Sequence, residues 1–151
     1  MAESNLLSFN CADLQFELPR ALAIKSTIFD YIKAAGLTLG FLEYVFCSDE
    51  FLLEINKEYL GHDYYTDIIS FPLESNPLEA NIFISVERVK DNAQKYKQDF
   101  KTEIIRVVGH GLLHILGFND GSPEEKQEMR QQEAVFIDRV LKLNQTVNKE
   151  G

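Results

Sequence analysis

The chain has 151 residues, a formal net charge of −9 and a hydrophobic content of 45%. This length fits one domain with a sizeable core, and the hydrophobic content excludes a disordered chain. The acidic balance excludes a general nucleic-acid-binding protein coated in Lys and Arg, while leaving local phosphate contacts open.

Two further features concern the compartment. No apolar run approaches the roughly 18 residues that span a bilayer, and the N-terminus lacks the basic start and apolar core of a signal peptide. Cys11 and Cys47 are far apart without CxxC spacing, so we expect two buried, reduced thiols. These features predict a cytoplasmic protein without a membrane partner, made of one domain over 1–151 with a flexible tail over 144–151.

The first half of the chain predicts alternating strands and helices. Apolar and polar residues alternate over Asp13–Leu18, which indicates a strand. Pro19 suits the first turn of a helix that continues to about Ala35. Phe41–Cys47 is rich in aromatic and β-branched residues and predicts a second strand. Ser48 can then cap a helix that stops at Gly61.

The second half predicts two more strands and then helices alone. The strands are expected at Thr66–Phe71 and Asn81–Ser85, and the helices at Val86–Tyr96 and Lys101–Leu116. A last helix begins at Ser122, where Pro and Glu follow in a capping-box pattern. Early strands and late helices predict an α+β domain with a four-stranded mixed sheet and helices packed on it.

Two of the three histidines, His110 and His114, lie four residues apart on the most apolar predicted helix. This spacing places both imidazoles on one helix face, where they can meet one ion. Gly117 can end the helix, and Asp120 then brings a carboxylate back toward the histidines. Two nitrogens, one oxygen and an open position are typical of a catalytic zinc site. The alternative is a pair of core histidines bonded to backbone carbonyls.

The motif differs from that of the common zinc proteases. HExxH enzymes use a Glu after the first His to deprotonate water, whereas this chain has Gly111 there. The spacing therefore favours a phosphodiester over a peptide as the substrate of a hydrolytic metal site.

The same residues resemble the YbeY family of metal-dependent endoribonucleases, which act in ribosomal RNA maturation. The family signature HGxLHxxGYDH appears as HGLLHILGFND at 110–120, and a second stretch resembling TDVLSFP appears as TDIISFP at 66–72. Further matching residues are Asn56, Tyr59, Glu124, Glu125, Met129 and Glu133. The resemblance covers nearly the whole chain in the same order.

The resemblance implies a single-strand-specific endoribonuclease that acts in 16S ribosomal RNA 3′-end maturation and ribosome quality control. Its metal, zinc or another divalent ion, would be held by His110, His114 and Asp120 on a metzincin-like helix. The implied partners are ribosomal RNA and the ribosome or its assembly factors, with neither DNA nor a membrane.

Three positions depart from the family pattern. Asp120 stands where the family has a third His, and it makes harder ions such as manganese more plausible. Asn119 replaces the preceding Asp. Leu60 replaces an Arg that could clamp a phosphate. His62, two residues on, either replaces that Arg in part or is a solvated loop histidine.

The TDIISF stretch offers further candidate substrate contacts. As a strand it sends Asp67, Ile69 and Phe71 to one face and Ile68 and Ser70 to the other. It is either a plain core strand or, as the resemblance implies, a strand beside the metal cleft. In the second case Asp67 and Ser70, together with His62, would contact the substrate.

A modest basic segment, Arg88 to Lys101, is by itself typical of a solvated helix face, but next to a ribonuclease site it could guide RNA. Two other functions fit the motifs. A metal-dependent hydrolase of another substrate, such as a peptide, would share the ligands. A ribosome-associated factor without catalysis would use the metal only for structure, and Leu60 favours it.

Overall fold

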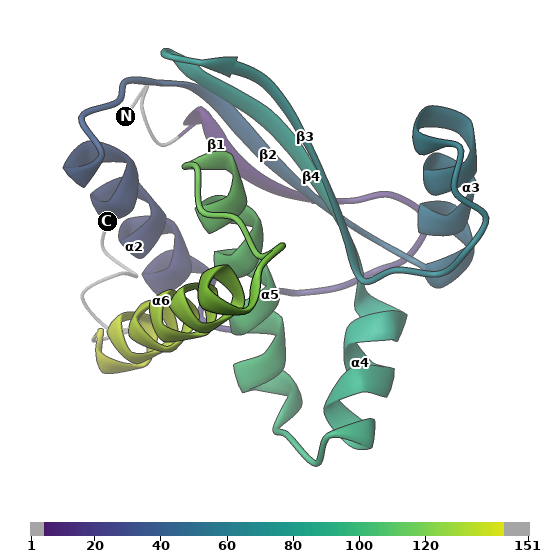
Figure 1. Cartoon of the computed structure of the whole chain (residues 1–151). Helices are drawn as coiled ribbons and strands as arrows, with labels where there is room; N and C mark the ends of the chain where they lie inside the picture. The colour runs from purple at the N-terminus through teal and green to yellow at the C-terminus, as the bar shows by residue number, and fades with distance from the viewer. Residues whose placement is uncertain (1–4, 144–151) are drawn as a thin grey trace.

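The computed structural model describes residues 5–143, which form a four-stranded sheet and five helices (Figure 1). The strands are β1 (Leu7–Cys11), β2 (Leu39–Cys47), β3 (Ile68–Ser75) and β4 (Leu78–Ser85). The helices are α2 (Ala21–Ala34), α3 (Asp49–Leu60), α4 (Val86–Lys95), α5 (Phe100–Ile115) and α6 (Pro123–Lys142). The predicted α+β class and mixed sheet are confirmed.

The sheet has the strand order β1-β2-β4-β3. β1 and β2 pair in parallel, as do β2 and β4, while β3 and β4 pair antiparallel. The parallel pairs need crossovers, which α2 supplies between β1 and β2. The β3–β4 connection is a tight hairpin turn at Asn76 and Pro77, so β3 becomes the edge strand nearest to α5.

The two faces of the sheet are covered differently. The main core lies on one face, where alternate residues of β2 and β4 pack with α2, α4 and α5, and α6 packs in turn on α2 and α5. Figure 1 shows α3 set apart from them, at the far end of the sheet. It packs on the other face, where Leu52 joins Cys47 and Ile69 in a small second cluster. The sheet thus separates α3 from the α2–α5–α6 layer, and β3 borders both.

The predicted helix signals are confirmed except at Pro19, which lies in a turn before α2, whose N-cap is Arg20. The Ser48 hydroxyl accepts a hydrogen bond from the Phe51 amide, and Gly61 ends α3 with a φ of 69°. At the start of α6, Ser122 and Glu125 form the expected capping box.

The strand predicted at Asp13–Leu18 is wrong. The first strand is Leu7–Cys11, and residues 12–18 form an irregular connection. The alternation is nevertheless real, since Leu14 and Phe16 pack on the core and Leu18 is buried. The intervening Asp13 accepts hydrogen bonds from Ser48. A loop running across the core edge can produce period-two burial without pairing to a neighbouring strand.

The two thiols differ from expectation in one respect. Both cysteines are free and Cys47 is buried, but Cys11 is exposed at the end of the edge strand β1. No helix within residues 5–143 is long and apolar enough to cross a membrane. The tail expected over 144–151 lies outside the described residues.

Helix α5 approaches α6 closely at Gly109. A Cβ atom there would lie 2.5 Å from Cδ2 of Phe136, a fully buried ring of α6. Only glycine allows this approach, which brings the metal-motif helix within reach of side chains on α6.

We predict that Gly109→Ala lowers the free energy of unfolding by about 1–2 kcal/mol. Overpacking costs about 1–3 kcal/mol, and a 2.5 Å approach to a fully buried ring places this substitution at about 2–3 kcal/mol. The better helix propensity of Ala returns about 1 kcal/mol. Urea titration followed by circular dichroism measures the change. Gly121→Ala is the control, because its Cβ would lie 3.5 Å from the nearest Glu125 oxygen. Equal stability of both variants would contradict this packing.

Candidate metal centre

Helix α5 holds the two histidines of the motif on one face. The other sides of the helix are buried in the core through Val107, Val108 and Leu112. This packing holds the helix in place and so fixes the direction of its histidine face. The His110 and His114 rings have centroids 4.6 Å apart and lie nearly perpendicular. Their side chains are 19% and 33% exposed, respectively. Both imidazoles are therefore held together at a partly open surface.

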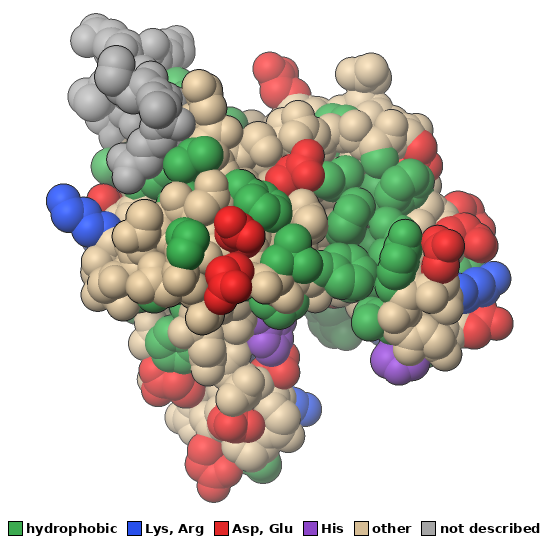
Figure 2. Space-filling model, turned by 90° about the horizontal axis from the view of Figure 1, so that it is seen from above, with side chains coloured by type: hydrophobic (Ala, Val, Ile, Leu, Met, Phe, Trp, Pro, Cys, Tyr) green, Lys and Arg blue, Asp and Glu red, His purple; other side chains and the backbone are tan. Residues whose placement is uncertain are grey.

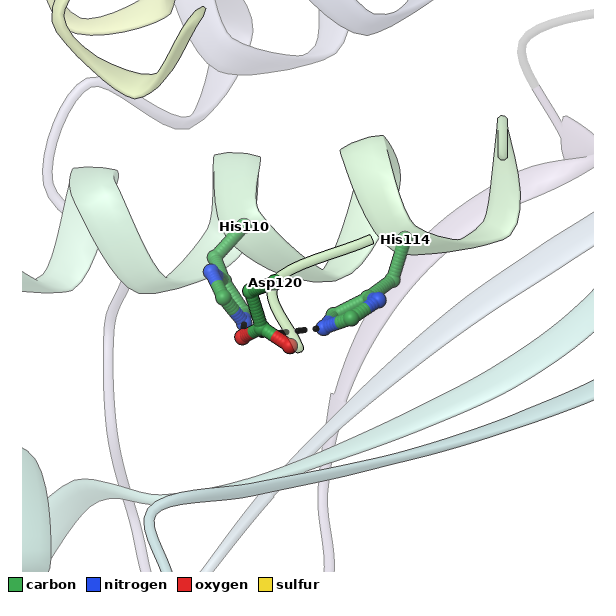
Figure 3. A group of neighbouring side chains, drawn as sticks. All are labelled: His110, His114 and Asp120. Carbon is green, nitrogen blue, oxygen red and sulfur yellow. Dashed lines mark ion pairs between the residues drawn. The ribbon is translucent and has the colours of Figure 1, made fainter. Parts of the chain in front are cut away.

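The chain turns sharply after α5 and returns beside the histidines. Gly117 has a φ of 108°, which glycine adopts without strain, and the Phe118 amide donates to the Leu113 carbonyl at 2.9 Å. This ending closes the helix and directs the loop back. Figure 3 shows Asp120 on that loop, with its carboxylate between the two rings.

The three side chains have the spacing of ligands around one ion. Oδ2 of Asp120 lies 3.7 Å from Nε2 of His110 and 3.5 Å from Nε2 of His114. All three ligand atoms fall within 4.8 Å of one another. Neighbouring ligands on a tetrahedral zinc ion at roughly 2.0–2.1 Å lie about 3.3 Å apart. The separations are too long for good hydrogen bonds but suit a shared cation, so the donor set fits a metal ion.

A buried carboxylate orients the first histidine. Glu133 of α6 is 4% exposed, and its Oε2 lies 2.6 Å from Nδ1 of His110. A carboxylate at this distance favours the tautomer with hydrogen on Nδ1, which leaves the Nε2 lone pair free. That lone pair is on the side of Asp120 and His114. This arrangement is typical of histidines that bind metals.

The histidines open into a cleft of about 540 Å³ between α5, β3 and the loop that follows α3. The cleft brings together the predicted substrate residues His62, Asp67 and Ser70, and Leu60 lies on the same wall. Figure 2 shows histidine side chains at two places on a hollowed edge of the molecule. The predicted substrate residues and the two histidines thus line one cleft.

Comparison with known proteins decides the family. A family model described as Endoribonuclease YbeY matches residues 5–141. The chain belongs to this family. It is 42% identical over 135 residues to Endoribonuclease YbeY of Cytophaga hutchinsonii, covering 88% of this chain and 94% of that protein.

A second relative and a solved structure agree with this assignment. The chain is 39% identical over 148 residues to Endoribonuclease YbeY of Amoebophilus asiaticus, covering 95% of this chain and 100% of that protein. The solution structure of TM1509 from Thermotoga maritima shares the fold, with a TM-score of 0.66 at 21% identity over 89% of this chain and 88% of that one. Membership of the YbeY family supports endoribonuclease activity.

The structure adds Glu103 and Arg106 to the surroundings of the candidate metal site, because both lie behind Glu133. Arg106 donates from Nη2 to Glu103 at 2.6 Å and from Nη1 to Glu133 at 3.1 Å. Burial acts to raise the pKa of Glu133, but the hydrogen bond to His110 and the charge of Arg106 lower it overall. The sequence held one signal for these two residues. At spacings of three and four positions, a single stripe of the apolar helix carries Glu103, Arg106, His110 and His114. Charged residues on such a helix need partners, so the stripe could have indicated a polar cluster.

The TDIISF stretch lies beside the cleft, as the resemblance implied. Ile68 faces α5, where a Cβ on Gly111 would meet it at 2.9 Å, while Ile69 and Phe71 lie on the opposite face with Phe83. Asp67 precedes the strand and does not follow its alternation. Burial raises the pKa of its carboxyl, against the opposing charges of Arg106 and His110. An acidic group with a raised pKa in a cleft is a candidate for substrate contact.

We predict that Glu133→Gln weakens zinc binding about tenfold, because carboxylates behind metal-binding histidines contribute about 10–100-fold to affinity. The substitution keeps the shape of the side chain but removes the charge next to His110. Calorimetric zinc titration gives the affinity. Glu124→Gln, an exposed carboxylate at the start of the same helix, should bind zinc like the wild type. Unchanged affinity in Glu133→Gln would show that Glu133 serves the fold alone.

Proposed function

We propose that this protein is a metal-dependent, single-strand-specific endoribonuclease of ribosomal RNA, acting in 16S 3′-end maturation and ribosome quality control. The observation that carries the proposal is the spacing of His110, His114 and Asp120 at an open cleft. Family membership supplies the reaction class. We infer that the whole chain, 1–151, works as one hydrolase domain in the cytoplasm.

We propose that His110, His114 and Asp120 hold one zinc ion, with manganese as an alternative. When bound, the ion supplies Lewis-acid chemistry to a phosphodiester and a water molecule. Glu133 contacts the His110 ring, and the helical backbone of α5 sets the position of His114 relative to His110. The protein thereby keeps the ligands arranged before the substrate arrives.

The cleft residues would contact the RNA on the opposite side. We propose that the Asp67 carboxyl binds a water or a ribose hydroxyl, because its position between β3 and α5 places it across from the histidines. Ser70 supplies a hydroxyl on the inner face of β3, opposite Ile82. His62 lies on the loop after α3 and borders the cleft from outside.

The basic segment of α4 and the following turn can guide the RNA only in part. Arg88 is held by Asp49, with Nη2 and Oδ2 2.5 Å apart, so its charge is already compensated. The exposed Lys95, Lys97 and Lys101 remain as candidates for backbone phosphates. Long-range attraction of RNA by this segment should therefore be modest. The proposed partners are ribosomal RNA and the ribosome or its assembly factors.

One observation favours a second function, that of a ribosome-associated factor with a structural metal. Leu60 lines the cleft where the family pattern has Arg, and a phosphate clamp is therefore lost. In that case chelation would lower the melting temperature, and no metal would restore RNA cleavage.

We predict that His114→Ala reduces cleavage of a small-subunit ribosomal RNA fragment more than a hundredfold. The loss exceeds the 10–100-fold cost of removing an outer partner because a ligand itself is gone. Gel analysis of cleavage with added zinc or manganese measures the rate. His62→Ala provides the comparison, since a rim residue should have a smaller effect than a ligand. Equal rates for His114→Ala and wild type would refute the metal mechanism.

We predict that Asp120→His shifts metal preference toward zinc. An oxygen ligand suits harder ions such as manganese, whereas a third imidazole suits zinc. Competitive titration of both ions gives the ratio of their affinities, which should change at least tenfold in favour of zinc. Because this readout does not involve RNA, it tests Asp120 as a ligand independently of activity. An unchanged ratio would mean that Asp120 does not bind the ion.

A further inference from the structure

The outer rim of the cleft carries two aromatic rings arranged as a stack. The His62 and Tyr64 rings have centroids 5.1 Å apart and are inclined by only 17°. The Tyr64 hydroxyl and Nδ1 of His62 are joined by a hydrogen bond of 3.0 Å. Both side chains border the same cleft as His110 and His114. The two rings are therefore ordered by each other at the edge of the proposed active site.

This stack does not belong to the core. The Tyr64 residue is 56% exposed, and His62 is exposed as well. The backbone beneath them is fixed separately, because the buried Asn56 donates from Nδ2 to the Tyr64 carbonyl at 2.9 Å. Aromatic rings stabilise a fold mainly when their surface is buried, so two exposed, parallel rings on a fixed backbone add little to the free energy of unfolding. It suits a surface on which another flat ring can stack.

The charges around the cleft exclude a phosphate clamp at this rim. Among the described residues that line the cleft, none is Lys or Arg. The nearby Lys57 is engaged by Glu54 at 3.6 Å and by Asp63 at 3.7 Å. An anionic RNA backbone gains little ionic attraction there. Binding at this rim must therefore use contacts other than ion pairs with Lys or Arg.

We propose that Tyr64 and His62 form a stacking platform for an unpaired base of the RNA next to the cleaved bond. The proposal rests on the ribonuclease function above, and it assigns recognition of an unpaired base to the rim of the cleft. Every base has a π face, so such a platform tolerates any sequence but requires the base to be free of a duplex. The preference for single strands then comes from the rim, while the metal ligands serve the reaction.

Binding is tested in the His114→Ala background, so that cleavage does not interfere. Fluorescence anisotropy follows a short labelled single-stranded oligoribonucleotide. Adding Tyr64→Leu, which keeps apolar volume but removes the ring, should lower affinity about five- to 150-fold, the equivalent of one stacked base at about 1–3 kcal/mol. Tyr64→Phe keeps the ring and should stay within about threefold. Tyr65→Leu, at an exposed tyrosine that does not line the cleft and whose hydroxyl donates to Glu50, should bind normally.

Two further measurements distinguish stacking from ionic binding. An oligomer with abasic positions should bind the parent protein as weakly as the intact oligomer binds the Tyr64→Leu variant. Each ionic phosphate contact adds a slope of about −0.7 to log affinity against log salt for single strands, and we expect a total no steeper than about −1. Circular dichroism and the melting temperature should be unchanged in Tyr64→Leu, since the ring is exposed.

The outcomes separate the platform from the activity. If wild type cleaves RNA but Tyr64→Leu and the abasic oligomer bind normally, the platform is wrong and the ribonuclease function stands. If the oligomer binds through Tyr64 but no divalent metal supports cleavage by wild type, the platform stands and the proposed function fails. Absence of any RNA binding would overturn the platform.

Discussion

The contact between His110 and Glu133 connects the fold to the proposed chemistry. It joins α5 to α6 at 2.6 Å, next to the close approach that Gly109 allows. Glu103, Arg106 and Glu133 together carry one net negative charge in a largely buried place. An unbalanced buried charge is costly, so a cation held beyond His110 would stabilise the whole group. The donor set at His110, His114 and Asp120 has the spacing to hold such a cation.

Local patterns in the sequence were enough to place the two histidines and the returning carboxylate. Residues four apart on a helix must share a face, and Gly117 could end that helix because of its conformational freedom. The caps at Ser48 and Ser122 were equally predictable, since their hydrogen bonds involve residues three positions away. Features of this kind depend on neighbours in the chain and need no knowledge of the tertiary structure.

Features that depend on distant residues were missed or misjudged. The partner of His110 is 23 residues away on another helix, so the sequence could match Glu133 to the family pattern but could not show that it contacts His110. The segment Asp13–Leu18 has a strand-like pattern, yet whether it pairs depends on which strand lies beside it, and β1 already occupies that edge. The stacking of Tyr64 on His62 likewise depends on Asn56, which fixes the loop from a buried position in α3.

An acidic protein that binds RNA has to concentrate its attraction in a small area. With a net charge of −9, the surface as a whole repels a polyanion, and the family position that could clamp a phosphate is Leu60. The candidate attractive contacts with RNA that remain are a metal ion at the histidines and stacking on the exposed rings of the rim. Both act over short distances. Such a cleft gains little from a duplex, whose bases are already stacked on one another. Under the proposed function, weak ionic attraction would therefore favour selective binding of unpaired RNA over indiscriminate binding to its backbone.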